Sequence, residues 1–251
     1  MNIYSKIFPV IFLFFMGFTV MTSAAETREP GQLTSAGTTS ASLNPGQATD
    51  ADTPIVRMIT PGLFEIGGVR LNKQEGTVEF DAVVNMNEGL LEYLIVGNGG
   101  KTHESLLRTE AEPYNIQIAL LMIGLEGTMN PLSEQGDPRI PEGNPVTIWL
   151  RWEHDGKIEN FQIERWVVNK NSGGVLSPMN WIFTGSIISN GAFMAQVEKS
   201  IVAIFHDPVA LIDNPLKEGA SDEIWYVNEK EAPPVGTKVT VTIRKAGKEG
   251  R

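Results

Sequence analysis

Residues 146–157 read Val-Thr-Ile-Trp-Leu-Arg-Trp-Glu-His-Asp-Gly-Lys, and this stretch decides the fold class. Every second position carries an apolar side chain, which is the period-two pattern of a half-buried strand: Val146, Ile148, Leu150 and Trp152. Asp155-Gly156 then predicts a two-residue turn into a second strand that begins at Lys157. The stretch therefore predicts a β-hairpin.

Further strands are predicted on both sides of this hairpin. Residues 77–84 alternate in the same way, whereas residues 90–96 are almost continuously apolar, which favours a strand covered on both faces. Asn190-Gly191 is a second hairpin turn, and residues 238–244 alternate again. The chain is therefore expected to be rich in β-structure.

The sequence contains one persuasive helix. Pro113 suits its first turn and Gly124 suits its end. Apolar residues between them recur at three- and four-residue spacing: Ile116, Ala119, Leu120 and Ile123. Strands on both sides of a single helix predict an α+β fold, with a largely antiparallel β-sheet and one main helix. A β-sandwich with an inserted helix is the alternative.

The beginning of the chain has the pattern of an export signal. Lys6 precedes an uncharged run over 7–21, and the small residues Ala24 and Ala25 follow. We interpret residues 1–25 as a signal peptide, which is either cleaved or retained as an anchor. Four regions are therefore predicted: the signal at 1–25, a disordered linker at 26–53, a single globular domain at 54–246 and a frayed tail at 247–251.

Composition excludes several classes of function. The chain has no cysteine, which rules out disulfides, thiolate zinc sites, cysteine nucleophiles and an iron–sulfur cluster on protein thiolates, and no cofactor is predicted. Its formal charge of -10 disfavours binding to nucleic acid or to anionic lipid. Removal of the signal would also remove the only apolar run near spanning length, so no membrane insertion is expected afterwards. The expected partner is an unknown envelope or extracellular ligand.

One polar segment combines residue types that can bind or catalyse: Lys101, His103, Glu104 and Ser105. In an extended chain, neighbouring residues point to opposite faces, so His103 and Glu104 are not expected to reach the same atom. A hydrogen-bonded network beside the sheet is the simpler interpretation. Five tryptophans fall in the second half of the chain, and an exposed tryptophan could add to a binding surface.

The three histidines share a feature, because each is followed by a carboxylate: His103-Glu104, His154-Asp155 and His206-Asp207. Three histidines can bind zinc and leave a position open for catalysis. Their spacing is wide and no His-x-x-x-His pair occurs, so no metal site is predicted. A site formed by His103, His206 and Asp207 is kept as an alternative.

Several segments resemble one protein family: Gly100 to Leu107, Met179 to Ser186, His206-Asp207-Pro208, Asp213-Asn214-Pro215 and Asn228 to Thr237. Together they are similar to the YdjY-domain proteins of bacteria, over roughly Leu63 to Arg244. The resemblance implies an exported protein without an assigned activity. Some relatives carry a ferredoxin-like label, which fails here because no cysteine can hold a cluster. It also implies that the segments around Lys101 and Trp181 belong to one architecture.

We therefore expect an exported, soluble, non-enzymatic binding or scaffolding domain, in the periplasm or at the cell surface. Its candidate binding surface combines Lys101, His103, Glu104, Ser105 and Trp181. The alternative is a hydrolase or metal-dependent enzyme centred on His103. A structural subunit of an envelope assembly is a third possibility.

Overall fold

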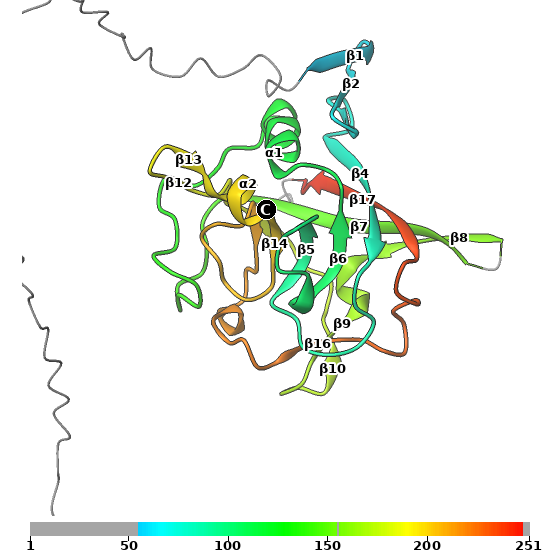
Figure 1. Cartoon of the computed structure of the whole chain (residues 1–251), viewed down its shortest axis with the longest axis vertical. Helices are drawn as coiled ribbons and strands as arrows, with labels where there is room; N and C mark the ends of the chain where they lie inside the picture. Colours follow the sequence, from blue (N-terminus) through cyan, green and yellow to red (C-terminus); the bar gives the residue numbers. More distant parts are fainter. Residues whose placement is uncertain (1–54, 155, 248–251) are drawn as a thin grey trace, which may run out of the picture. The chain divides into compact units, whose positions relative to one another are not determined.

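Two long strands organise the structure, β4 (Thr77–Val84) and β7 (Asn144–His154). The computed structural model describes residues 55–247 except residue 155 (Figure 1). The predicted signal peptide and linker, the Asp155 half of the first hairpin turn and nearly all of the predicted tail lie outside the described residues.

A third long strand, β17 (Lys238–Lys245), lies between β4 and β7 and pairs with both of them. From β7 the ring of strands continues through β11 (Trp181–Phe183), β15 (Ile212–Asp213), β14 (Ser200–Ala203), β5 (Tyr93–Gly97) and β6 (Ser105–Thr109). The end of β6 pairs with the end of β4, Val83 opposite Arg108, and this pairing closes eight strands into a barrel. Only β14–β15 and β5–β6 are parallel within this ring.

Both organising strands extend beyond the barrel. The first half of β4 pairs with β3 (Val69–Asn72), which continues into β2 (Leu63–Ile66) and the edge strand β1 (Val56–Thr60). The second half of β7 pairs with β8 (Lys157–Gln162), and Figure 1 shows this hairpin extending away from the barrel. Each of these two strands therefore pairs with β17 in the barrel and, over about half of its length, also with a strand of a projecting arm.

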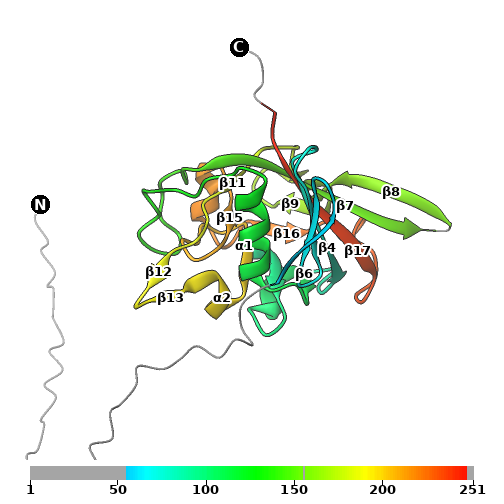
Figure 2. The ribbon, with the colours of Figure 1, turned by 90° about the horizontal axis from the view of Figure 1, so that it is seen from above.

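Smaller elements surround the barrel. One helix has ten residues, α1 (Pro113–Met122), and it contacts β3, β4 and the short α2 (Met194–Glu198), beside which it lies in Figure 2. A three-stranded sheet and a two-stranded hairpin complete the β-structure: β9 (Val167–Asn169), β10 (Gly174–Val175) and β16 (Trp225–Val227), with β12 (Ile188–Ser189) and β13 (Ala192–Phe193). The 3₁₀ turns are η2 (Thr102–Glu104), η3 (Ile163–Trp166) and η4 (Lys217–Ala220).

The core lies inside the barrel because alternate strand residues point inward. On the three long strands the inward positions are fully or almost fully buried: Val78, Phe80, Ala82 and Val84, then Val146, Ile148 and Leu150, then Val239, Val241 and Ile243. Trp166, Trp181 and Trp225 are also fully buried. The opposite positions of the same strands carry mostly charged and polar residues, with Val83 and Trp149 among them, and form an outer face.

The predicted fold class is wrong in its architecture. The chain forms neither an open sheet with one main helix nor a β-sandwich, because β6, at one end of the sheet, pairs with β4 and closes the ring of strands. The fold is mostly β, with eight strands in a closed barrel and one helix longer than two turns among the described residues. Alternation identifies strands, but it does not say which strand pairs with which, so an open sheet and a closed one have the same local pattern.

Several local predictions are confirmed. The strand predicted over 77–84 has these bounds, and residues 93–96 of the apolar run lie in a fully buried strand. Asn190 and Gly191 both have positive φ, at 51° and 79°, as a two-residue hairpin turn requires.

Among the described residues, no helix has the length and apolar character needed to span a bilayer.

Candidate functional site

The segment from Lys101 to Ser105 is not the extended chain that the alternation argument assumed. Residues 102–104 form the 3₁₀ turn η2, which brings His103 and Glu104 to the same side. His103 Nε2 lies 3.3 Å from Glu104 Oε2, and the histidine side chain is 77% exposed. The expectation that these two residues point apart is therefore wrong. An exposed pair of this kind contributes little to stability.

Hydrogen bonds fix this turn from the inside. The hydroxyl of the fully buried Ser105 donates to the Lys101 carbonyl at 2.6 Å. The Asn85 side-chain amide donates to the carbonyls of Thr102 and Ser105. Ser105 therefore supports the turn, and its hydroxyl is not exposed to solvent.

Tyr93 links this turn to the loop between β14 and β15, which carries Asp207. Lys101 Nζ donates to the Tyr93 hydroxyl at 2.8 Å, and that hydroxyl donates to Asp207 Oδ2 at 2.7 Å. Gln135 Nε2 also donates to the Tyr93 hydroxyl oxygen, at 3.3 Å. A phenol has one donor and two acceptor sites, so its hydrogen bonds are complete. Burial, with Asp207 beside it, raises the pKa of Tyr93 well above its usual range.

Two glutamates lie next to Tyr93. The Glu92 backbone N–H donates to the Glu104 carbonyl at 3.0 Å, and Glu92 Oε2 accepts a bond from Gln135 at 3.1 Å. Partial burial, reinforced by the nearby Glu104 carboxylate, raises the pKa of Glu92. The Lys101 ammonium is thus surrounded by acidic groups, and it already donates to Tyr93.

His206 is fully buried, and a backbone carbonyl faces each of its ring nitrogens. Nδ1 lies 2.7 Å from the Asp137 carbonyl and Nε2 lies 3.0 Å from the Asn214 carbonyl. Gly219 packs against the ring so closely that an added Cβ would overlap Nε2. Neither nitrogen is free to contact a substrate or a metal ion.

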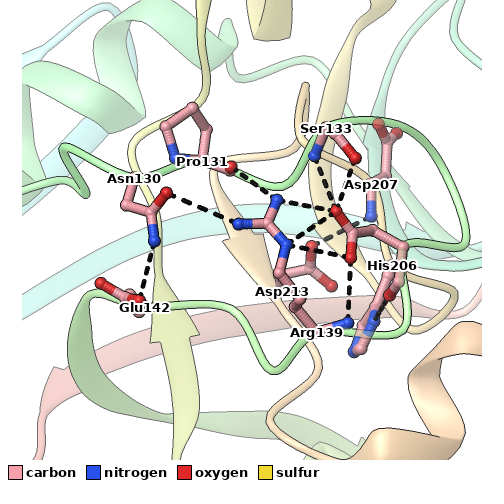
Figure 3. Close-up of polar contacts among 9 residues, drawn as sticks. Asn130, Pro131, Ser133, Arg139, Glu142, His206, Asp207 and Asp213 are labelled. Carbon is pink, nitrogen blue, oxygen red and sulfur yellow. Dashed lines mark hydrogen bonds and ion pairs between the residues drawn. The ribbon is translucent and has the colours of Figure 1, made fainter.

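The long loop over residues 125–143 is held by one ion pair. The Asp137 carboxylate accepts bonds from the Arg139 guanidinium, with Nη2 2.7 Å from Oδ2, and from the Ser133 backbone and hydroxyl at 2.9 and 2.7 Å. Arg139 also donates to the Pro131 carbonyl at 3.0 Å (Figure 3). These bonds, the Arg139 bond above all, hold the pKa of Asp137 well below its usual range.

This loop packs on the segment that carries His206. The Gly136 backbone N–H donates to the His206 carbonyl at 2.8 Å, and Gln135 reaches Tyr93 and Glu92 from the same loop. Loops of this length without secondary structure are uncommon and are often functional. Here the loop joins the Lys101 side of the cluster to the His206 side.

Two buried aspartates complete the cluster, and Figure 3 shows them beside His206. Asp207 accepts bonds from Tyr93 and from the Val209 backbone. Asp213 accepts bonds from the Asp207 and Asn214 backbones at 3.0 and 2.7 Å. Burial raises the pKa of Asp207 and raises that of Asp213 strongly, in spite of these bonds. We call the whole cluster the Tyr93–His206 network: Glu92, Tyr93, Lys101, Gln135, Asp137, Arg139, His206, Asp207 and Asp213.

Trp181 does not take part in this cluster. It is fully buried in the core, and its indole N–H donates to Glu164 Oε1 at 2.9 Å. Burial raises the pKa of Glu164. Trp181 therefore adds nothing to an exposed binding surface. The predicted surface is reduced to exposed His103 with the partly exposed Lys101 and Glu104.

The geometry does not assemble a metal site from the described residues. No group of three or more histidine, aspartate or glutamate side chains among them is placed to hold a metal ion. His103 lies at the surface with only Glu104 as an ionic partner, whereas both nitrogens of His206 face carbonyls. The side chain of His154 is outside the described part.

A cavity of about 490 Å³ lies on the outer face of the strands, and none of the sequence-predicted site residues line it. β4, β6, β7, β8 and β17 form its walls. It has six charged lining residues: Asp81, Arg108, Glu110, Arg151, Glu153 and Lys238. Val83, Trp152 and Ile158 add apolar surface. We call this cavity the strand-face cleft.

Sequence reasoning missed the strand-face cleft and the centre of the Tyr93–His206 network. The charged residues of the cleft occupy the polar positions of alternating strands, which look the same as any solvated face. Tyr93 lies within an apolar run and Gln135 lies in a loop without periodicity. The His206-Asp207 and Asp213-Asn214 pairs were the only signals of this centre.

Comparisons with known proteins give a family but no characterised relative. A family model for the YdjY domain matches residues 69–244. Comparison with curated proteins and with solved structures found no significant match. The family match covers most of the chain and includes every strand of the barrel except the last residue of β17. The chain therefore belongs to the YdjY-domain family.

Proposed function

We propose that this protein is an exported, soluble, non-enzymatic binding or scaffolding domain whose ligand occupies the strand-face cleft. One contrast carries the proposal. In the Tyr93–His206 network the groups capable of chemistry are hydrogen-bonded to neighbouring groups of the protein, whereas within the described residues the three basic side chains of the cleft have no ion pair or hydrogen bond.

The bonding within the network argues against catalysis there. A general base needs a free lone pair, and a nucleophile needs a hydroxyl that can reach the substrate. His206, Tyr93 and Ser105 are all fully buried, and neighbouring groups occupy their polar atoms. The hydrolase or metal-dependent alternative centred on His103 has only the exposed His103–Glu104 pair in its favour.

Export and the site of action rest on the sequence. The uncharged run over 7–21, followed by small residues, supports export, and a cysteine-free chain needs no oxidising machinery to fold outside the cytoplasm. We expect the protein in the periplasm or at the cell surface, with no lasting membrane insertion once the signal is removed. Fractionation of native cells tests this, and finding the chain only in the cytoplasm would contradict it.

Blocking the cleft tests the binding role. Val83→Trp places an indole in the cleft, and Val175→Trp makes the same change at an exposed position of β10. Tagged chains purified from native envelope extracts should retain a ligand or partner in the wild type and in Val175→Trp, but lose it in Val83→Trp. Equal recovery with all three chains would contradict binding at the cleft. A hydrolytic activity that disappears in His103→Ala would favour the enzymatic alternative.

A further inference from the structure

We infer that the strand-face cleft binds an acidic segment of extended polypeptide, with one carboxylate on each side of a central apolar residue. This inference rests on the proposed function, because it names the class of ligand for the same cleft.

Two of the acidic side chains in the cleft have hydrogen-bond partners, whereas the three basic side chains have none within the described residues. Asp81 accepts a hydrogen bond from the Thr240 hydroxyl at 3.4 Å, and Glu110 accepts one from the Asn98 amide at 2.9 Å. Arg108, Arg151 and Lys238 have no ion pair or side-chain hydrogen bond within the described residues. Arg108 is also half-buried, and a desolvated cation without a partner is unfavourable. A ligand that supplies carboxylates would complete these three groups.

Strand register places the cations in a defined order. Arg151 lies opposite Thr240, and Thr240 lies opposite Asp81. In the next row, Lys238 lies opposite Val83, and Val83 lies opposite Arg108. Residues directly opposite one another, or two apart on one strand, project from the same face. All three cations therefore stand on the outer face, on three different strands.

The spacing of the strands sets the length of the ligand. Arg151 and Arg108 are three strand spacings apart, about 14 Å at roughly 4.8 Å per spacing, and their rows are two residues apart along the strands, about 7 Å, so the two backbone positions are about 16 Å apart. An extended peptide advances roughly 3.3 Å per residue, so residues i and i+4 are about 13 Å apart and point to the same side. The long arginine side chains cover the remaining difference of about 3 Å, so a peptide with acidic residues at these positions can pair with both arginines at once. Lys238 lies between them and can bind either carboxylate.

The apolar surface of the cleft favours an apolar side chain in the middle of the ligand. Val83 lies between Lys238 and Arg108 in the same row, so residue i+2 of the peptide meets an aliphatic side chain. Within the described residues, Glu153 is the one acidic residue of the cleft without a partner, and it lies opposite Ile158 at the β8 end. It repels a third carboxylate there. A single phosphate group can neither span the two arginines nor use Val83.

Peptide titrations test the inference. The probes are acetylated and amidated Glu-Ala-Val-Ala-Glu, Gln-Ala-Val-Ala-Gln and Lys-Ala-Val-Ala-Lys, and inorganic phosphate. Each is added to the ¹⁵N-labelled full chain and followed by amide chemical shifts. The glutamate peptide should shift the amides of Val83, Arg108 and Lys238 and bind at least about tenfold more tightly than the glutamine peptide, since charge-assisted hydrogen bonds are the stronger ones.

Matched variants locate the site. Arg108→Gln and Arg151→Gln should each weaken the glutamate peptide about tenfold, whereas Arg70→Gln, at an exposed position of β3 outside the cleft, should not. The dispersion of the amide spectrum shows whether each variant is folded. Added salt should weaken binding of the glutamate peptide more than that of the glutamine peptide.

The outcomes separate this inference from the proposed function. If the glutamine or lysine peptide occupies the cleft as tightly as the glutamate peptide, the ligand class is wrong and the binding role stands. If phosphate produces the same shifts at the same concentration, the cleft is a simple anion site and the peptide inference is wrong. If no probe shifts the cleft amides and Val83→Trp retains every wild-type partner, both proposals fail.

Discussion

The Tyr93–His206 network and the strand-face cleft contain similar side chains, and they differ in how these are paired. In the network, one phenol, one imidazole and three aspartates share their hydrogen bonds in a buried space. In the cleft, three cations stand apart around a cavity of about 490 Å³. Buried polar groups that are fully bonded hold a structure together, whereas exposed groups without partners are available to a ligand. The difference predicts that changes in the network affect stability and that changes in the cleft affect binding.

The largest effect is expected at Gly219, where the network leaves no space. Gly219→Ala would push the His206 ring away from the Asp137 and Asn214 carbonyls and should lower the free energy of unfolding by about 3 kcal/mol. Urea unfolding measures this. Gly174→Ala, where the added Cβ meets only an ordinary contact with Ser172, is the control and should change little. Equal stability of the two variants would show that the His206 ring is not held tightly.

A smaller loss is expected at the centre of the network. Tyr93→Phe removes one hydroxyl and leaves Lys101, Gln135 and buried Asp207 without that partner, so it should cost about 2 kcal/mol. Tyr226→Phe, which loses only a 3.3 Å contact with Lys170, is the matched control. Thermal and urea unfolding should separate the two variants. A Tyr93→Phe chain that instead loses ligand while keeping its stability would move the binding site to the network.

A smaller, pH-dependent effect on stability is expected at Glu164. Burial raises its pKa, so its stabilising contribution is fully present below the ordinary value of 4.5 and is lost as pH rises through the raised value. Glu164→Gln cannot ionise, and its side-chain oxygen can still accept the Trp181 bond. The variant should match the wild type near pH 4 and be more stable than it at pH 8.

Urea unfolding at several pH values provides the measurement for Glu164. Glu229→Gln removes a carboxylate from an exposed position and serves as the reference for a surface change. A Glu164→Gln chain that is less stable than the wild type at pH 8 would contradict the expected direction of the pH effect.

The smallest effect on stability is expected in the cleft. Arg108→Gln and Arg151→Gln remove cations that have no partner within the described residues, so each should change the free energy of unfolding by less than about 0.5 kcal/mol. The same variants should lose ligand. A loss of more than about 2 kcal/mol at either arginine would make the cleft a structural feature and remove the contrast with the network.

The sequence predicts local structure well in this protein, because alternation and turn chemistry depend on neighbouring residues. The strand over 77–84 and the turn at Asn190-Gly191 are examples. Closure of the barrel depends on Val83 lying opposite Arg108, and a β-pattern does not encode the choice of partner. The α+β prediction therefore identified the elements and missed their arrangement.

The sequence likewise identified some residues of the candidate site and missed the residues that they contact. His206 and Asp207 were identified because histidine followed by aspartate is conspicuous in a sequence with three histidines. Their partners Tyr93 and Asp137 lie 114 and 69 residues away along the chain. Trp181 was expected at a surface, but an aromatic residue in a short strand gives no signal that separates core from groove. The cleft depends on five strands that meet only in the folded chain.

The position of β17 has a consequence for how the protein is made. It is the last strand of the described chain, yet it lies between β4 and β7, which are much earlier in the sequence. Until residues 238–245 emerge from the ribosome, these two long strands each lack a neighbour and keep an open edge. Pairings between distant segments form slowly, and unpaired edges invite association with other chains. The barrel therefore cannot close before residues 238–245 are available, and until then the free edges of β4 and β7 can pair with other chains.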